Sequence, residues 1–169
     1  REMLLKISEA NINELPFYHF IEGKLAGCDV TIARTGYTGE LGFEIYGEKE
    51  VIPKIWDAIY NIGKPMGLVP AGLAARDTLR MEMKFCLYGN DIDETTHPYE
   101  SGLGWITKID KGDFIGREAI IDRKKNMTRR LVCVEMIDRA IPRQGYQIFI
   151  DKYKVGYFTS GSQSPSLQK

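Results

Sequence analysis

The sequence predicts an α+β fold in which helices and strands dominate different stretches and the C-terminal part is all β. Three observations predict it. β-Branched and aromatic runs flank a glycine-rich turn, two segments with helical spacing follow it, and only strand-like runs occur beyond residue 128. We therefore expect two domains, residues 1–127 and residues 128–169.

The composition and charge of the chain restrict the kinds of partner that it can attract. The 169 residues hold 43% hydrophobic side chains, which is enough for a core, and 23 basic residues balance 23 acidic ones. A net charge of zero gives no global field toward nucleic acid or an anionic membrane. No apolar run approaches the roughly 18 residues of a membrane helix, and no signal peptide is visible. Three cysteines without a Cys-x-x-Cys pair indicate reduced thiols, so we expect a soluble intracellular protein.

The glycine-rich run over residues 34–45 predicts a hairpin. Residues 30–33 and 43–46 favour extended structure, while Gly36, Gly39 and Gly42 permit a turn and a close approach to the main chain. Because side chains alternate along a strand, Phe43 and Ile45 share one face and Glu44 takes the other. Glu44 should therefore face a cleft or solvent.

Two interpretations of Glu44 stay open at this point. It is either an ordinary solvent-facing strand residue or a carboxylate presented to a ligand. The Gly-x-x-Gly-x-x-Gly spacing is not that of a dinucleotide-binding turn, and no phosphate-binding Gly-x-x-x-x-Gly-Lys loop occurs. A nucleotide-binding fold is therefore disfavoured.

Helical spacing comes next. Apolar residues over 50–62 predict an amphipathic helix, with Pro53 in its first turn and Gly63 as its stop. A second helix is expected over residues 71–83 and a third over 116–124. Arg76 could fork onto a ligand carboxylate or pair structurally with Glu44 or Asp77, and Asp77 could pair with Arg80.

The second half reads as turns and strands. A turn is expected at residues 88–91 and a strand at 103–109, with Trp105 and Thr107 on the face opposite Ile106. The basic stretch 123–130 lacks interleaved aromatics, so it predicts a solvated linker and not a nucleic-acid patch. Strands are expected at 131–136, 147–150 and 154–159.

No metal site is predicted. A calcium loop that began at Asp91 would need Gly and Glu where the chain has Thr96 and Gly102. His19 and His97 lack neighbouring ligands at zinc spacing. Cys86 is expected to be a packed thiol, since no base is apparent beside it.

Six blocks of the sequence are each a weak signal when taken alone. The blocks are residues 34–44 (RTGYTGELGFE), 71–80 (AGLAARDTLR), 87–93 (LYGNDID), 102–105 (GLGW), 114–119 (FIGREA) and 159–166 (TSGSQSPS). Together they resemble the aminomethyltransferase (T-protein) of the glycine cleavage system, and they occur in that family's order from about Thr31 onward.

The resemblance implies a folate-binding α/β portion followed by a C-terminal β-barrel, here incomplete. It implies a transferase that moves the methylene of an aminomethyl-lipoyl group, carried by the H-protein, to tetrahydrofolate and releases ammonia. By the same resemblance Glu44 and Arg76 contact the folate, and Tyr37 and Trp105 line its pocket. No metal, nucleic acid or membrane is implied, and the location is cytoplasmic in a bacterium or the mitochondrial matrix in a eukaryote.

The departures from the family pattern matter as well. The family's catalytic aspartate lies upstream of anything present here, so no residue of this chain is given that role and we expect the chain alone to be inactive. The barrel should be open, with an unpaired edge.

Two relatives offer rival functions, the folate-binding module of sarcosine or dimethylglycine dehydrogenases and a non-catalytic folate-binding protein of iron-sulfur assembly. The motif of the latter matches residues 84–90 (KFCLYGN) poorly. A generic interaction domain is the remaining alternative.

Overall fold

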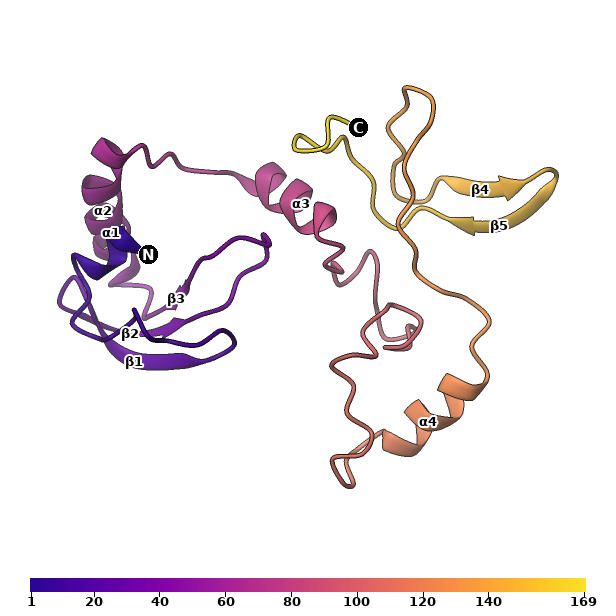
Figure 1. Cartoon of the computed structure of the whole chain (residues 1–169), viewed down its shortest axis with the longest axis horizontal. Coiled ribbons are helices and arrows are strands. Elements are labelled where there is room, and N and C mark those ends of the chain that lie inside the picture. The colour runs from indigo at the N-terminus through magenta and orange to yellow at the C-terminus, as the bar shows by residue number, and fades with distance from the viewer. The chain divides into compact units, whose positions relative to one another are not determined.

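The computed structural model describes residues 1–169 as two compact units, Arg1–Leu79 and Arg80–Lys169. Figure 1 shows helices and strands in both units, which confirms the predicted α+β class. The expected domain boundary between residues 127 and 128 stays a prediction.

The first unit is built on one antiparallel sheet. Its strands are β1 (Phe20–Leu25), β2 (Cys28–Ala33) and β3 (Glu44–Tyr46), with β2 in the centre. Ala26 and Gly27 join β1 to β2 with φ of 54° and 73°. Two positive φ values suit the right-handed twist of a two-residue hairpin, so the turn fixes the pairing of Leu25 with Cys28.

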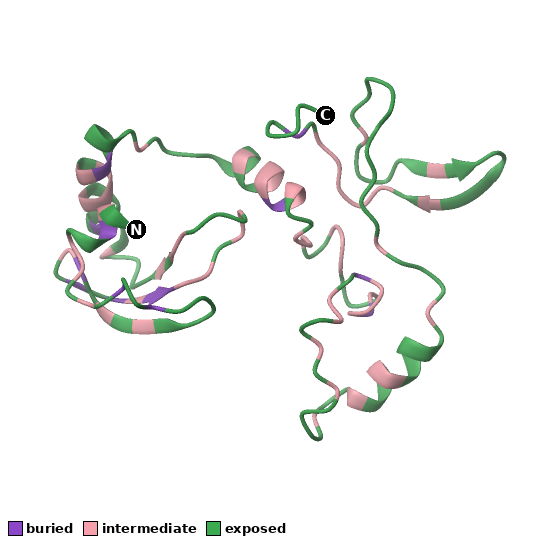
Figure 2. Ribbon diagram, in the orientation of Figure 1, coloured by how far each residue is buried: buried purple, intermediate pink, exposed green.

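The core of the first unit lies between this sheet and two helices, α1 (Glu2–Leu5) and α2 (Ile52–Gly63). Along β2, Val30 and Ile32 are buried while Asp29 is exposed, which is the alternation of a half-covered sheet. In the first unit, Figure 2 shows buried stretches on α2 and on β2, which border this core. The core members are Leu4, Ile12, Leu25, Cys28, Val30, Ile32 and Ile55.

Helix α2 confirms the helix expected over residues 50–62, with Pro53 in its first turn. The α-helix ends at Gly63, as expected, and the chain then forms the 3₁₀ turn η1 (Lys64–Met66), which ends before Gly67, whose φ is 87°. A Cβ on Gly63 would lie 2.5 Å from Leu68 Cδ2. Gly63 is therefore required for close packing, and Gly67 supplies the left-handed cap.

The other two expected helices are confirmed as α3 (Leu73–Glu82) and α4 (Arg117–Lys125). The longest helix of the chain is α2, with 12 residues, and no helix is long and apolar enough to cross a bilayer.

In the second unit, β4 (Gln147–Ile150) and β5 (Tyr153–Tyr157) form an antiparallel hairpin with an irregularity between Ile148 and Phe149. The turn holds Asp151 at a φ of 53°, a conformation that Asp tolerates better than most residues. These strands confirm two of those predicted, with β5 beginning at residue 153 and ending at residue 157.

The strand expected over residues 103–109 is wrong. The amide of Ile106 donates to the carbonyl of Leu103 at 3.2 Å, and that of Thr107 donates to Gly104 at 3.2 Å. The Thr107 hydroxyl also donates to the Leu103 carbonyl at 2.9 Å. Local turn bonds therefore satisfy the backbone groups that a sheet would have used.

The strand expected over residues 131–136 is wrong as well, because β4 and β5 pair only with each other. The Leu131 amide donates to the carbonyl of Glu100 at 2.7 Å, in a loop. An apolar, β-branched run becomes a strand only where another strand pairs with it and completes the backbone hydrogen bonds of a sheet.

A buried ion pair organises the second unit. Arg80, with 3% of its side chain exposed, donates from Nη1 to Asp91 Oδ2 at 2.6 Å, and the Asp91 side chain is 6% exposed. Arg80 Nη2 donates to Ser160 Oγ at 2.8 Å, and Thr159 Oγ1 donates to Asp91 Oδ1 at 2.5 Å. The sequence suggested Asp77 as a partner for Arg80, and the structure gives it this pair with Asp91. The ion pair joins Arg80 to Asp91, and its hydrogen bonds with Thr159 and Ser160 connect both residues to the block that begins at Thr159.

Candidate functional site

The glycine-rich run forms the connection between β2 and β3, as predicted. Ala33 pairs with Glu44 and Ile32 pairs with Ile45. Phe43 and Ile45 pack against the core of the first unit, whereas Glu44 is exposed. The predicted alternation is therefore confirmed, and the carboxylate of Glu44 faces outward.

Glycine is needed in this connection at Gly39, whose φ is 76°. At Gly36 an added Cβ would meet no atom within 4 Å. The main chain there borders open space, which leaves room for a ligand beside it.

Thr35 contacts the Glu44 carboxylate directly, since its hydroxyl donates a hydrogen bond to Glu44 Oε2. Sequence reasoning missed Thr35. The register could have found it, because Thr35 lies two residues beyond Ala33, the cross-strand partner of Glu44.

Arg76 lies over the ring of Tyr37. The guanidinium carbon is 4.4 Å from the ring centroid, within the range of a cation–π contact. Arg76 comes from α3 and Tyr37 from the glycine-rich connection, so the structure brings together two of the predicted site residues. No ion pair joins Arg76 to Glu44, one of the structural pairings that the sequence left open.

Trp105, the fourth predicted site residue, belongs to the second unit. It sits in the turn over residues 103–107 and is 62% exposed. Its expected place on a strand face is wrong, because local turn hydrogen bonds take up the backbone groups around it. That it lines one pocket with the other three residues stays a prediction.

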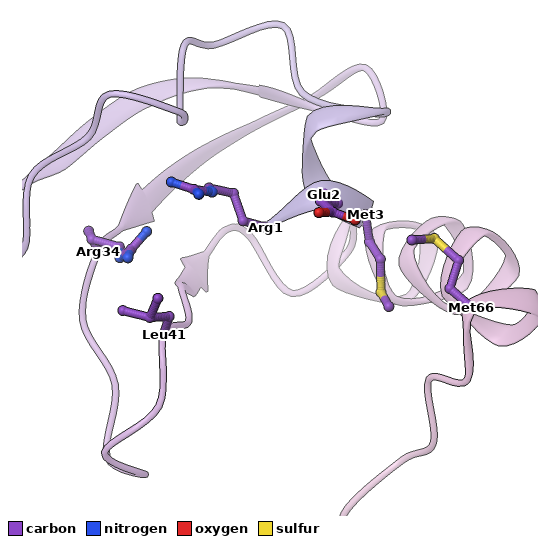
Figure 3. Close-up of a pocket in the computed structure, with 6 residues that line it drawn as sticks. All are labelled: Arg1, Glu2, Met3, Arg34, Leu41 and Met66. Atoms are coloured by element: carbon purple, nitrogen blue, oxygen red, sulfur yellow. The ribbon is translucent and has the colours of Figure 1, made fainter.

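A separate shallow pocket of about 310 Å³ opens on the first unit (Figure 3). Arg34 and Leu41 border it from the glycine-rich connection, and Met3 and Met66 border it from the helical side. The Arg34 guanidinium lies 4.9 Å from the centroid of the Phe43 ring, and its Nε is buried without a partner. None of the predicted site residues lines this pocket.

Both halves of the chain match sequence models of one family. Residues 1–111 match the model described as the GCVT N-terminal domain, and residues 129–169 match the glycine cleavage T-protein C-terminal barrel domain. The chain belongs to the T-protein family. The resemblance that the sequence blocks gave is thereby confirmed.

Curated relatives in the T-protein family agree. An aminomethyltransferase of Halothermothrix orenii is 49% identical over 100% of this chain and 48% of its own length. One of Phocaeicola vulgatus is 49% identical over 97% of this chain and 46% of its own length. The chain spans about half the length of the curated relatives it matches.

A solved structure supports the fold. The crystal structure of glycine cleavage system aminomethyltransferase T from Bartonella henselae matches with a TM-score of 0.80 at 32% sequence identity. The match covers 92% of this chain and 43% of that one.

Proposed function

We propose that the protein carrying this chain is a tetrahydrofolate-dependent aminomethyltransferase of glycine cleavage. It would transfer the methylene of an aminomethyl-lipoyl group, carried by the H-protein, to tetrahydrofolate with release of ammonia. Family membership and relatives named aminomethyltransferase support this function. The observation that carries this chain's own part is the outward carboxylate of Glu44, held by Thr35 beside the glycine-rich connection.

Glu44 is proposed to bind the pterin ring. An ionised carboxylate only accepts hydrogen bonds, and its two oxygens can take two parallel N–H groups from one ligand edge. The pterin edge presents such N–H donors side by side. Glu44 therefore acts as an orienting group in this proposal and not as an acid or base.

Arg76 and Tyr37 are proposed to hold another part of the folate. Lying over Tyr37, the planar guanidinium of Arg76 keeps its N–H fork free at its edges for carboxylate or carbonyl oxygens of a ligand. Trp105, exposed in the second unit, is proposed to supply a flat wall for the flat ring.

The residues of this chain thus bind and orient the acceptor. No residue of this chain is assigned the catalytic proton transfer. We infer that the lipoyl-bearing H-protein is a partner of the protein that carries this chain.

Titration calorimetry of the full-length protein with tetrahydrofolate tests the proposal. Glu44→Ala removes two charge-assisted hydrogen bonds to the ligand, each worth about 1.5–3 kcal/mol, so affinity should fall by roughly 100-fold or more. Glu22→Ala makes the same change of charge at another exposed position of the same sheet and is the matched control. Unchanged affinity in Glu44→Ala would contradict the assignment.

A further inference from the structure

We propose that Thr35 is a positioning residue, which fixes the Glu44 carboxylate in the orientation that receives the ligand. This inference rests on the proposed folate-binding function of Glu44. The proposal assigns to Thr35 a role that the sequence alone did not suggest.

The contact is direct. The Thr35 hydroxyl donates to Glu44 Oε2, and it reaches that oxygen because Ala33, two residues earlier, is the cross-strand partner of Glu44. β-Branching leaves a threonine few χ1 rotamers, so its hydroxyl points in a defined direction. The Thr35 hydroxyl therefore has fewer accessible orientations than the Glu44 carboxylate that it contacts.

Glu44 needs such a restraint. It lies exposed in the three-residue strand β3, where a glutamate would otherwise sample several rotamers. Ordering a flexible, charged side chain on binding costs conformational entropy. A hydrogen bond that orders the carboxylate before the ligand arrives removes part of that cost from binding.

The hydrogen bond also leaves capacity for the ligand. A carboxylate has about four acceptor positions, and Thr35 occupies one of them on Oε2. Oε1 and the second position of Oε2 can still accept two N–H groups. The ligand class that fits is a planar heterocycle with an amino group beside a ring N–H.

Thr35→Val tests the role, because valine has nearly the same shape and β-branching but no hydroxyl. We expect the Kd for tetrahydrofolate, measured by calorimetry on the full-length protein, to rise about 10-fold, the effect of one hydrogen bond to a charged group. Thr35→Ser keeps the hydroxyl and should bind within about 2-fold of the wild type.

The double variant, Thr35→Val with Glu44→Ala, distinguishes a positioning role of Thr35 from a merely structural one. If Thr35 acts through Glu44, Thr35→Val should weaken binding no further in a Glu44→Ala background. Equal weakening in both backgrounds would overturn the proposal, as would wild-type affinity of Thr35→Val when Glu44→Ala binds weakly. If Glu44→Ala itself binds normally, the proposed function falls, and the role of Thr35 falls with it.

Folding is checked by circular dichroism and thermal melting of each variant. Should Thr35→Val fail to fold, Thr35→Ala removes the same hydroxyl without adding a methyl group, and the same outcomes decide.

Discussion

Asp91→Asn is expected to destabilise the second unit by about 3 kcal/mol, since it removes one charge from a buried ion pair. Asp91 accepts from Arg80 Nη1 at 2.6 Å, from the Leu87 amide at 2.9 Å and from Thr159 Oγ1 at 2.5 Å. The Arg80 side chain is only 3% exposed, so water cannot replace the lost carboxylate.

The magnitude follows from the geometry. Removal of one partner of a buried ion pair costs about 3–5 kcal/mol, because the remaining charge loses that attraction where water cannot replace it. Asparagine can place its amide oxygen at the Oδ2 position, where it still accepts from Arg80 and Leu87, and its NH₂ group toward the Thr159 hydroxyl, which can rotate to accept. The cost is therefore mainly the loss of charge, and the retained hydrogen bonds set it near the lower end of that range.

Two measurements on the full-length protein check this value. Urea unfolding gives the change in free energy, and hydrogen exchange at the Leu87 amide reports the local opening of the site. Asp110→Asn, at an exposed aspartate of the same unit, is the matched control and should change stability by less than about 0.5 kcal/mol. A loss below about 1 kcal/mol in Asp91→Asn, with unchanged exchange at Leu87, would refute the reasoning.

The remaining predictions concern pH and close packing. Burial alone raises the pKa of Asp91, but hydrogen bonds from Thr159, Leu87 and Ser160 and the charge of Arg80 together lower that pKa below its ordinary value of 3.8. The stability that this carboxylate contributes is therefore fully present above about pH 3.8, and it is lost as the pH falls through the lower pKa of the folded state. Acid unfolding curves of Asp91→Asn should lack this loss of stability. Gly161→Ala should destabilise by about 1–3 kcal/mol in thermal melting, since its Cβ would lie 2.4 Å from the Pro142 carbonyl oxygen, whereas Gly156→Ala, with no atom within 4 Å, should not. An equal effect of the two alanines would show that close packing at Gly161 is not what requires glycine there.

The elements that could be predicted from the sequence are those whose backbone hydrogen bonds are made within the same short stretch of chain. The hairpin of β2 and β3 is one, because two strand-like runs flank a glycine-rich turn and pair with each other. Helix α2 is another, because its apolar spacing and Pro53 are local features. The strands predicted over residues 103–109 and 131–136 were wrong, because the pattern of each run favours a strand but does not specify a second strand to pair with it. Thr107 and Leu131 instead bond within turns and loops.

The site could be predicted in part for the same reason. The alternation of Phe43, Glu44 and Ile45 follows from the two-residue period of a strand, so the exposure of Glu44 could be predicted from the sequence. The contact between Arg76 and Tyr37 joins a helix to a connection 39 residues earlier, and no local pattern specifies it. Thr35 lay between these cases, since only the register of β2 and β3 reveals its partner.

The way in which the two charged groups are held bears on what they can bind. Glu44 receives its hydrogen bond from a neutral hydroxyl, and Arg76 rests on a neutral ring. Had the two formed an ion pair with each other, each would have satisfied the other and left little charge for a ligand. Held by neutral partners, the carboxylate keeps free acceptor positions and the guanidinium keeps free donors. Thr35 and Tyr37 of the glycine-rich connection therefore hold a carboxylate and a guanidinium without neutralising either charge, and a ligand that satisfies both must carry N–H donors as well as acceptor oxygens. A reduced pterin with a glutamate tail has both, whereas a purely anionic or purely apolar ligand would leave one of the two groups unsatisfied.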